Sequence, residues 1–289
     1  MIDLAVIPAA GLGTRLFTIT KETPKEMIPI FYRTQKEEVL VKPLLEIIFE
    51  NLFDSGIRSF CFIVGRGKEE IENHLSPHYE FIDLLRKKGE YDYAKILLKL
   101  YQKIEKSSIV WIRQHVQEGL GSATILAKQF VGDRTFLFHA GDLYIPNPKY
   151  IKELTSIHQK LKPSATLGIK KVNDPQHYGV AKLRKMKNGI YEVTHVVEKP
   201  KNPTSNFVLT GVNVFEPNIF DAIKKTKKSV KNEIQLTNGI QTLISENNKI
   251  FASKMKINDI CIDIGTPKNY FEAMKYSYRY DVSKNKLKV

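Results

Sequence analysis

The stretch LAVIPAAGLGTRLFTITKETPKEM, residues 4–27, predicts how the rest of the chain is organised. It opens on a short apolar run that is long enough for one buried strand. A loop of small residues follows, and such a loop lets backbone N–H groups approach and face an anion. Two cations come after the loop, as a phosphate site requires. The small residues and the two cations are Ala10, Gly11, Gly13, Arg15 and Lys25.

This loop differs from two common phosphate-binding motifs. A P-loop ends in Gly-Lys-Ser or Gly-Lys-Thr, and this loop does not. A dinucleotide-binding loop has a third glycine at the position where this chain has Leu16. Taken alone, the stretch leaves open an ordinary strand–turn–helix of an α/β protein.

The composition is that of an ordinary globular protein with an excess of positive charge. The chain has 289 residues, enough for a sizeable core in one large α/β domain or in two small ones. Its net charge is +14, from 45 Lys and Arg against 31 Asp and Glu. The lysines are spread along the chain instead of forming a stripe with stacking aromatics, which disfavours nucleic-acid binding.

The cysteines and the apolar runs bear on the cellular compartment. Cys61 and Cys261 both lie inside apolar runs and give neither a metal-binding spacing nor a disulfide framework. The chain begins almost directly in the first expected strand, without a basic-then-apolar leader, and no apolar run reaches membrane-spanning length. We therefore expect a cytoplasmic protein that binds no membrane.

Alternating helix and strand patterns in the first half predict a parallel sheet. After Pro43, residues 44–53 repeat apolar side chains at helical spacing, and the apolar run 59–64 suits a strand covered on both faces. Together with the first strand they make a βαβ unit. Further expected elements are an exposed irregular excursion at 31–41, an insertion of one or two helices at 81–106, strands at 109–112 and 135–140, a glycine turn into a helix at 118–123 and a helix at 150–161.

From residue 165 the expected strands come with few helices between them, and Asn188-Gly189 is a strong hairpin signal. The sequence therefore predicts a Rossmann-like α/β fold, with a mixed, mostly parallel sheet flanked by helices and a smaller β-rich part. No linker rich in Pro, Gly or Ser divides the chain, so we expect a single domain with halves at about 1–150 and 151–289. The expected elements are strands at 165–172, 179–183, 191–197, 207–214, 250–257 and 260–264, and helices at 217–224, at 234–245 and from Pro267.

Two aspartates lie at expected strand ends, where ligands bind in open α/β sheets. Asp142 follows the strand at 135–140, and Asp263 lies near the end of the run 260–264; each has a glycine close by. Two carboxylates of this kind suit Mg²⁺, which takes oxygen ligands and leaves positions for phosphate. The alternative is that each aspartate caps the turn that follows it.

Other polar positions and one glycine also begin or end strands. Glu198 and Lys199 precede Pro200, which would stop the strand and leave Glu198 to accept bonds from hydroxyls and Lys199 to meet a phosphate. An exposed ion pair is the alternative. Gln114 ends another strand, and its amide suits the edge of a pyrimidine base unless it is simply exposed to solvent. Gly179 begins a strand where backbone could touch a ligand.

Together, these motifs resemble the sugar-1-phosphate nucleotidylyltransferases. The resemblance spans nearly the full length and keeps the order of the family's motifs. Within the family, the helical insertion and the segment NEIQLT at 232–237 are most similar to the uridylyltransferases that act on glucose 1-phosphate. The other matching motifs are VIPAAGLGTR at 6–15, PKEM at 24–27, Arg113-Gln114 before Gly119-Leu120-Gly121, Gly141-Asp142, Tyr178-Gly179-Val180 and VEKP at 197–200.

The resemblance implies an enzyme, its substrates and its cofactor. Members of the family join a nucleoside triphosphate to a sugar 1-phosphate and release pyrophosphate. For this chain the resemblance implies UTP and glucose 1-phosphate as substrates, UDP-glucose as product, Mg²⁺ as cofactor and a homo-oligomer, dimer or tetramer. Attack of one phosphate on another needs positioning and charge neutralisation and no covalent enzyme intermediate.

The resemblance also assigns roles at the matching positions, with the half at about 1–150 binding the nucleotide and the half at about 151–289 binding the sugar. Arg15 and Lys25 would neutralise the triphosphate, and Asp142 and Asp263 would hold the metal. The expected catalytic residues are Arg15, Lys25, Asp142 and Lys199. The expected nucleotide-binding residues are Ala10, Gly11, Gly13, Thr14, Gln114 and Gly119, the last two at the uracil. The expected sugar-binding residues are Gly179, Glu198, Lys199 and Gly211, with Lys199 at the sugar phosphate.

Three departures from the family pattern leave alternatives open. The excursion at 31–41 is longer than usual, Asn238 stands where an aspartate is common, and Ala140-Gly141 precede Asp142 as in thymidylyltransferases. A thymidylyltransferase or a dual UTP/dTTP enzyme is therefore an alternative, since uracil and thymine differ by one methyl group. From another class, the alternative is a nucleotide-sugar-binding regulator, although a pure binder needs no metal carboxylates or cations for a leaving group.

Overall fold

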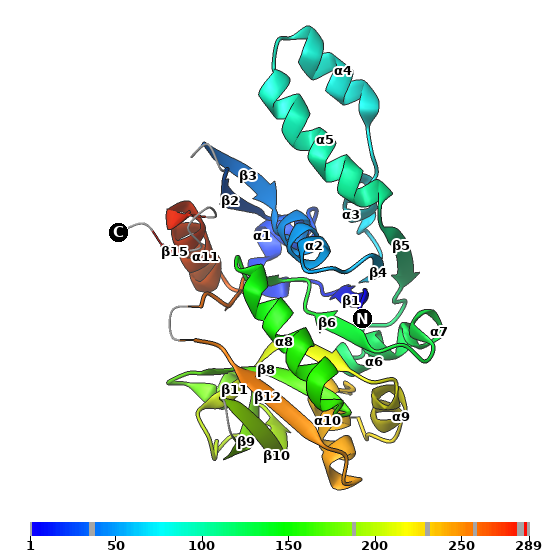
Figure 1. The fold of residues 1–289 in the computed structure, drawn as a ribbon, viewed down its shortest axis with the longest axis vertical. Helices are drawn as coiled ribbons and strands as arrows, with labels where there is room; N and C mark the ends of the chain where they lie inside the picture. The colour runs from blue at the N-terminus through cyan, green and yellow to red at the C-terminus, as the bar shows by residue number, and fades with distance from the viewer. Residues whose placement is uncertain are drawn as a thin grey trace.

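The computed structural model describes residues 2–34, 38–186, 189–228, 232–256, 259–281 and 286–287. A nine-stranded sheet runs through the described chain in the order β5-β4-β1-β6-β11-β8-β12-β10-β9 (Figure 1). Its strands are β1 Leu4–Ala9, β4 Ser59–Val64, β5 Ser108–Arg113, β6 Phe136–His139, β8 Ala165–Lys171, β9 Gly179–Lys185, β10 Ile190–Glu198, β11 Phe207–Phe215 and β12 Ile250–Lys254.

Short strands and helices surround this sheet. The short strands pair as β2 Pro29–Arg33 with β3 Val39–Pro43, β7 Leu143–Tyr144 with β13 Ile262–Asp263, and β14 Tyr280–Asp281 with β15 Lys286–Leu287. The α-helices are α1 Phe17–Thr20, α2 Leu44–Asp54, α3 Glu69–His74, α4 Tyr79–Lys87, α5 Tyr91–Glu105, α6 Leu120–Leu126, α7 Lys128–Val131, α8 Pro148–Leu161, α9 Asn218–Lys224, α10 Leu236–Ser245 and α11 Pro267–Arg279. In the part of the chain that the structure describes, no helix is long and apolar enough to span a membrane.

Strand β1 is apolar throughout because helices cover both faces of the sheet. Successive side chains of a strand point to opposite faces. Ala5 and Ile7 accordingly join a buried cluster with α2 and α8, whereas Leu4 and Val6 join a second cluster with α6, α9 and α10. All four side chains are 0% exposed. Because helices cover both of its faces, β1 is held in the middle of the sheet. The position of the loop that follows β1 is fixed in the same way.

The predicted fold class is confirmed. Parallel pairs join β5, β4, β1 and β6 in the first half of the chain. The second half forms the β-rich part, where β9 pairs antiparallel with β10, and β11 pairs antiparallel with β6 and β8. Residue 188 of the expected hairpin turn and residue 257 of the strand expected at 250–257 lie outside the described residues. Because one sheet crosses both halves, we propose that the chain is a single domain.

The prediction of an irregular excursion at residues 31–41 is wrong for its described part, although Val39 and Val41 are exposed as expected. Strands β2 and β3 form an antiparallel hairpin there, and residues 35–37 lie outside the described residues. Lys42 is only 6% exposed, because its ammonium pairs with Glu46 of α2 at 2.8 Å. The ring of Phe31 packs edge-on against Tyr278 of α11, with 5.3 Å between the centroids. The hairpin therefore depends on partners that its own sequence does not reveal.

The strand expected at residues 260–264 is also shorter than predicted. Only the two residues of β13 are extended and paired, and they lie outside the large sheet, opposite β7. Most of the apolar run is instead buried in the core beneath α11. The pattern thus indicated burial correctly and sheet membership wrongly. The pairing with β7, which follows Asp142 directly, still brings Asp263 to the same region.

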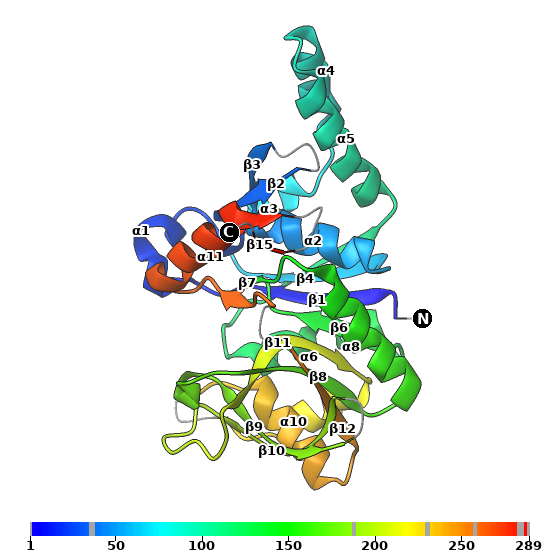
Figure 2. The ribbon, with the colours of Figure 1, turned by 60° about the vertical axis from the view of Figure 1, so that its left-hand side comes forward.

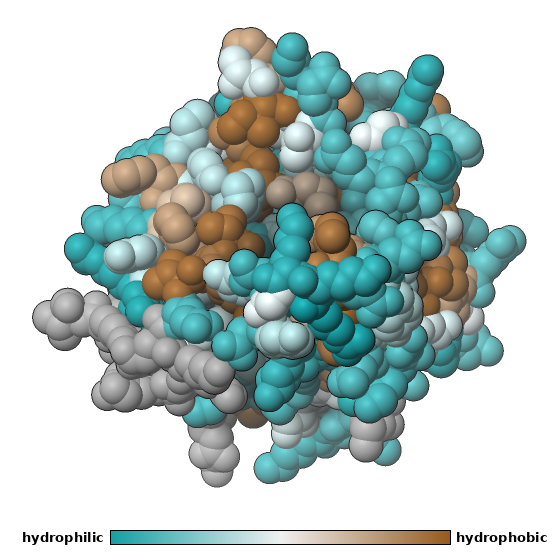
Figure 3. Space-filling view, turned by 90° about the horizontal axis from the view of Figure 1, so that it is seen from above, coloured by the Kyte–Doolittle hydropathy of each residue, from teal (hydrophilic) through white to brown (hydrophobic). Residues whose placement is uncertain are grey.

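The predicted helical insertion consists of two helices, α4 and α5, that project away from the sheet (Figures 1 and 2). Tyr79 and Tyr101 connect them through an edge-to-face ring contact with 5.5 Å between the centroids. Seen from that end, the surface is mainly hydrophilic with separate hydrophobic groups (Figure 3). Phe81 and Tyr91 on this hairpin are 44% and 69% exposed. The expected homo-oligomer stays a prediction.

His139, the last residue of β6, makes stability depend on pH. The side chain is 1% exposed, and burial lowers its pKa from 6.5 to about 4. Between those values the unfolded chain binds a proton that the folded chain does not. The stability from neutral His139 is therefore complete above about pH 6.5 and is lost as the pH falls towards 4.

We expect His139→Asn to lose less stability on acidification than the wild type, by on the order of 2 kcal/mol between pH 7 and pH 4.5. Urea unfolding at the two pH values measures the difference. The matched control is His177→Asn, the same substitution at a side chain that is 72% exposed. Equal pH dependence in wild type and His139→Asn would show that His139 is not the group responsible.

Candidate active site

The phosphate-loop residues lie at the carboxyl end of β1. Gly13 has a left-handed backbone, with φ at 65°, and the Thr20 hydroxyl closes the turn by donating to the Gly13 carbonyl at 2.9 Å. A Cβ on Gly13 would lie 2.9 Å from the Thr20 side chain. Gly11 and Thr14 are exposed on the loop. The structure therefore gives Gly13 a part in shaping the loop itself.

A cavity of about 380 Å³ opens beside this loop. Its walls combine the loop, the end of β6, the start of α6 and the segment before α10. Residues predicted from the sequence that line it are Ala10, Gly11, Lys25, Gln114, Gly119 and Asp142. The remaining lining residues are Pro8, Leu12, Glu26, Gln117, Leu120, Ala123, Ala140 and Glu233.

Lys25 and Asp142 form an ion pair in this lining. The Lys25 Nζ is 2.5 Å from Asp142 Oδ2, and the side chains are 15% and 21% exposed. Asp142 reaches the loop because Gly141 donates its N–H to the Pro8 carbonyl at 3.1 Å. A Cβ on Gly141 would lie 2.7 Å from that oxygen, so only glycine allows β6 to end so close to β1.

Asp263 and Arg15 belong to the same cluster of charges. Asp263 pairs with Leu143, the residue after Asp142, in the short β13–β7 ladder. Its Oδ1 accepts the Gly265 N–H at 2.7 Å. A guanidinium nitrogen of Arg15 lies 2.9 Å from the place that a Cβ on Gly265 would occupy. The structure thus brings together the two aspartates and the two cations that the sequence predicted.

These charges alter the acidity of both carboxyl groups. Burial raises the pKa of Asp142, but the positive charges of Lys25 and Arg15 outweigh it and hold that pKa below its ordinary value. Burial and the negative charge of Asp142 raise the pKa of Asp263. Asp142 is therefore the carboxylate that stays ionised most readily, and Asp263 is the one that takes up a proton first.

The two carboxylates fit a divalent cation that phosphate also ligates. Hard cations take carboxylate oxygens, and a cation there would relieve the repulsion that raises the pKa of Asp263. Among the described residues, no group of three or more His, Cys, Asp or Glu side chains is placed to hold a metal ion. If a metal ion binds there, Asp142 and Asp263 would supply two ligands, and water or a bound phosphate would have to supply the rest.

Gln114 is buried, which excludes the solvent-exposed alternative. It is 7% exposed, and its backbone N–H donates to the Val64 carbonyl at 2.8 Å. The side chain lines the cavity, and its Nε2 has no hydrogen-bond partner among the residues that the structure describes. A buried donor without a partner is costly. A ligand with a suitably placed acceptor would satisfy it.

Close chain packing requires the glycines at the start of α6. Gly119 has φ at 96°, and a Cβ on it would lie 2.7 Å from the Ile234 carbonyl oxygen. A Cβ on Gly121 would lie 2.8 Å from the same oxygen, which accepts the Gly121 N–H at 2.8 Å. The segment that carries the NEIQLT motif therefore lies directly against this turn. Gly119 lines the cavity and also makes this packing possible.

The predicted sugar-side residues form a second group. Glu198 and Gly179 face each other across β10 and β9, and Glu198 Oε2 accepts the Thr237 hydroxyl at 2.7 Å. A Cβ on Gly179 would lie 3.1 Å from that hydroxyl. Lys199 has a left-handed backbone, and its Nζ lies 3.3 Å from Glu198 Oε1 while 61% of the side chain is exposed. The observed contact of Lys199 is thus the exposed ion pair, and a bound anion can reach its ammonium.

Gly211 lies next to the wall of the cavity. It sits in the irregular part of β11 between Leu209 and Asn213, with φ at 87°. A Cβ on it would lie 3.3 Å from the Ala140 Cβ, and Ala140 lines the cavity. Gly211, like the sugar-side group, is absent from the lining of the cavity itself.

Comparison with known proteins identifies the family. The nucleotidyl transferase family matches residues 4–279. The chain belongs to the nucleotidyl transferase family. It is similar to a UTP–glucose-1-phosphate uridylyltransferase of Staphylococcus epidermidis, with 36% identity over 250 residues, which cover 85% of this chain and 82% of that protein. The resemblance inferred from the motifs is thereby confirmed.

Solved structures agree with this family membership. A UDP-glucose pyrophosphorylase in complex with UDP-glucose matches with a TM-score of 0.82 and 28% identity, over 97% of this chain and all (100%) of that one. A UTP-bound UGPase from Acinetobacter baumannii matches with a TM-score of 0.80 and 25% identity, over 95% and 93% of the two chains. The family generally uses a divalent metal ion, in line with the chemistry of the two aspartates.

Four residues at the site of this nucleotidyl transferase received no role from the sequence. Glu26 is fully buried and pairs with Lys68 at 2.8 Å, Gln117 donates to the Ala10 carbonyl at 2.7 Å, and Thr237 holds Glu198. Glu26 and Thr237 lie inside sequence motifs that resemble those of the family, so these motifs could have indicated that both residues belong to the site. Lys68 and Gln117 gave none, because their partners are 42 and 107 residues away.

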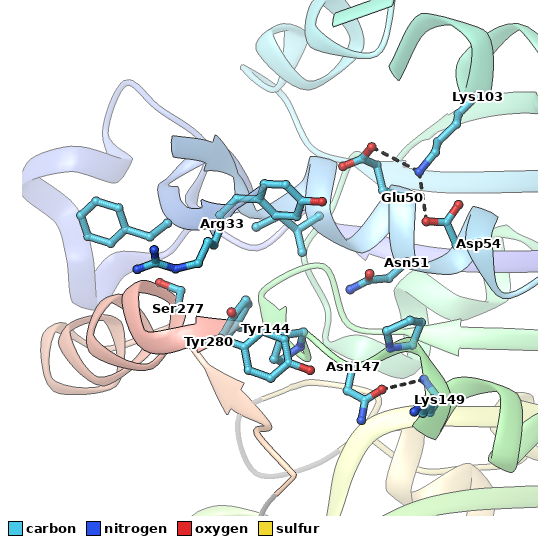
Figure 4. Close-up of a pocket in the computed structure, with 15 residues that line it drawn as sticks. Arg33, Glu50, Asn51, Asp54, Lys103, Tyr144, Asn147, Lys149, Ser277 and Tyr280 are labelled. Carbon is cyan, nitrogen blue, oxygen red and sulfur yellow. Dashed lines mark hydrogen bonds and ion pairs between the residues drawn. The ribbon is translucent and has the colours of Figure 1, made fainter. Parts of the chain in front are cut away.

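A second cavity of this nucleotidyl transferase, of about 310 Å³, is not lined by the predicted site residues (Figure 4). Residues of β2, α2, α8 and α11 surround it. Lys103 pairs there with Glu50 and Asp54 at 3.3 and 3.0 Å, and Asn147 accepts the Lys149 N–H at 3.0 Å. Because these polar groups satisfy one another, the cavity at the phosphate loop is the stronger candidate for chemistry.

Gly121→Ala tests the packing beside the cavity. By helix propensity alone, alanine in α6 would stabilise the protein by about 1 kcal/mol. The contact with the Ile234 carbonyl predicts instead a net loss of about 1–3 kcal/mol. Urea unfolding measures the change. In the matched control, Gly132→Ala, the new Cβ meets no atom within 4 Å, so it costs only the strain of its left-handed backbone. A Gly121→Ala variant at least as stable as the wild type would contradict the packing.

Proposed function

We propose that this protein transfers the uridylyl group of UTP to glucose 1-phosphate and so forms UDP-glucose and pyrophosphate. The observation that carries the proposal is the gathering of Arg15, Lys25, Asp142 and Asp263 at the phosphate loop. Two cations and two carboxylates at one loop suit two anionic substrates that share a metal ion. The names of the similar uridylyltransferase and UDP-glucose pyrophosphorylase support the choice of substrates.

The nucleotide would bind in the cavity at the phosphate loop. Backbone N–H groups around Ala10 and Gly11 would face the triphosphate, in the loop that Gly13 and Thr14 complete. The unpartnered Nε2 of Gln114 would donate to a carbonyl oxygen of uracil. Gly119 would bring its backbone close to the base, since it lines the same cavity.

Asp142 and Asp263 would hold Mg²⁺ together with phosphate oxygens. Bound there, Mg²⁺ would offset the negative charge that the two phosphates bring together. Arg15 and Lys25 would neutralise the triphosphate and then the departing pyrophosphate, as forked and point-like cations do at phosphate groups.

The sugar 1-phosphate would bind at the second group of residues. Glu198, held by Thr237, would accept hydrogen bonds from sugar hydroxyls. Gly179 and Gly211 would leave room for the ring, because neither carries a side chain. Lys199 would turn its exposed ammonium from Glu198 to the phosphate of the sugar, which is the stronger, charge-assisted partner.

The transfer itself would be a single displacement. A phosphate oxygen of glucose 1-phosphate attacks the α-phosphorus of UTP, and the bond from that phosphorus to the bridging oxygen of pyrophosphate breaks. The attacking phosphate is already ionised near neutral pH, so no side chain has to remove a proton. The residues of the chain orient the two substrates and neutralise their charges.

Pyrophosphate release from UTP and glucose 1-phosphate tests the proposal. We expect release to require both substrates and a divalent metal ion. Crossing UTP and dTTP with several sugar 1-phosphates separates the alternatives, since release with dTTP alone would indicate a thymidylyltransferase. No release with any pair would overturn the proposal, and binding without release would favour a regulator. The cytoplasmic location and the homo-oligomer stay predictions.

Gln114→Leu should separate stability from nucleotide binding. Leucine removes the buried, unpartnered donor, so the free energy of unfolding should stay the same or rise by up to about 1 kcal/mol. UTP affinity should fall roughly tenfold or more, because the base loses a buried hydrogen bond. Urea unfolding and equilibrium dialysis of UTP measure the two effects. The control is Gln129→Leu, at an exposed position of α7, which should change neither. Unchanged UTP affinity in Gln114→Leu would remove Gln114 from the base site.

A further inference from the structure

The ammonium of Lys25 contacts both the phosphate loop and one of the two candidate metal ligands. Its Nζ lies 2.5 Å from Asp142 Oδ2, in a pair whose side chains are 15% and 21% exposed. The same Nζ lies 3.2 Å from the place that a Cβ on Gly11 would occupy. Lys25 therefore lies between the loop that would receive phosphate and the carboxylate that would receive the metal ion.

Without a nucleotide, the described residues offer a metal ion few ligand oxygens. Asp142 and Asp263 are the candidate ligands, and no larger group of metal-binding side chains occurs in the described part of the chain. Asp263 Oδ1 already accepts the Gly265 N–H at 2.7 Å, and Asp142 Oδ2 is held by Lys25. A divalent ion that arrived alone would find one oxygen of each carboxylate already engaged, and it would meet the repulsion of the nearby ammonium.

A triphosphate changes this balance. It brings several negative charges to the loop over which the Lys25 ammonium already lies, and contacts between ammonium and phosphate are charge-assisted. Once the ammonium turns to phosphate, Asp142 Oδ2 is open to a metal ion that the triphosphate also ligates.

We propose that Lys25 occupies the metal-binding oxygen of Asp142 until a nucleotide arrives, so that the protein takes up its metal ion only together with the nucleotide. The inference rests on the proposed function, since it takes a nucleoside triphosphate as the ligand of the loop. The two binding events then strengthen each other by the same factor, as linkage requires. Lys25 thus determines when the metal ion binds, in addition to neutralising phosphate.

Binding of Mn²⁺ to the nucleotide-free protein tests the proposal, because carboxylate sites for Mg²⁺ also accept Mn²⁺. Equilibrium dialysis of the full chain measures the Mn²⁺ that is retained. Lys25→Met removes the charge and keeps much of the length, and it should bind Mn²⁺ at least about tenfold more tightly than the wild type. Lys25→Arg keeps the charge and should bind Mn²⁺ as weakly as the wild type.

Arg15→Met is the matched control for the loss of one positive charge near the carboxylates. Arg15 lies beside Gly265, and its influence on Asp142 is electrostatic. It should therefore tighten Mn²⁺ binding by less than about threefold, as expected for a screened charge. Equal tightening in Arg15→Met and Lys25→Met would overturn the proposal, as would no tightening in a Lys25→Met variant whose circular dichroism and urea unfolding show it to be folded.

Adding UTP to the same dialysis separates this inference from the proposed function. The wild type should retain Mn²⁺ and UTP together at a Mn²⁺ concentration that leaves it metal-free without UTP. If no UTP is retained, the proposed function fails. If UTP and Mn²⁺ are retained together but Lys25→Met binds Mn²⁺ alone no better than the wild type, the inference fails and the proposed function stands.

Discussion

The close approach of the ends of β1 and β6 is the constraint on which the site depends. Gly141 donates to the Pro8 carbonyl at 3.1 Å, where any side chain at position 141 would collide with that oxygen. The pairing of two strands that are buried on both faces sets this approach. It places Asp142 beside the loop that follows β1, although Asp142 and that loop lie far apart in the sequence. The short pairing of β7 with β13 then adds Asp263 to the same place.

A second feature is that the site balances its own charges before any ligand binds. Lys25 pairs with Asp142, and Lys68 pairs with Glu26, both in largely buried surroundings. Buried ion pairs contribute little net stability, because desolvation offsets much of the attraction between the charges. In the proposed function, a triphosphate would take over Lys25 and a metal ion would take over Asp142, so the partners of this pair would be exchanged for ligands. The proposed function implies the same exchange for Lys199, which pairs with Glu198 at an exposed position.

Local patterns in the sequence were enough to predict what local patterns encode. The apolar runs of β1 and β4 and the helical spacing of α2 gave elements close to those observed, and strand ends located Asp142. The hairpin of β2 and β3 was missed because its stabilising partners come from α2 and α11. For the same reason the sequence left the burial of Gln114 open and did not indicate the packing role of Gly119, since each depends on a distant segment. The periodicity of apolar residues indicates that a side chain is buried, but only the fold shows which residues it packs against.

The central claim is that the chain orients two anions for direct transfer, without a covalent intermediate. The stereochemical course at the α-phosphorus tests it most directly, with a single diastereomer of UTP that carries sulfur in place of one α-phosphate oxygen. A single in-line displacement inverts the configuration at phosphorus, so we expect UDP-glucose of inverted configuration. Retention would require two displacements through a covalent enzyme intermediate and would contradict this claim.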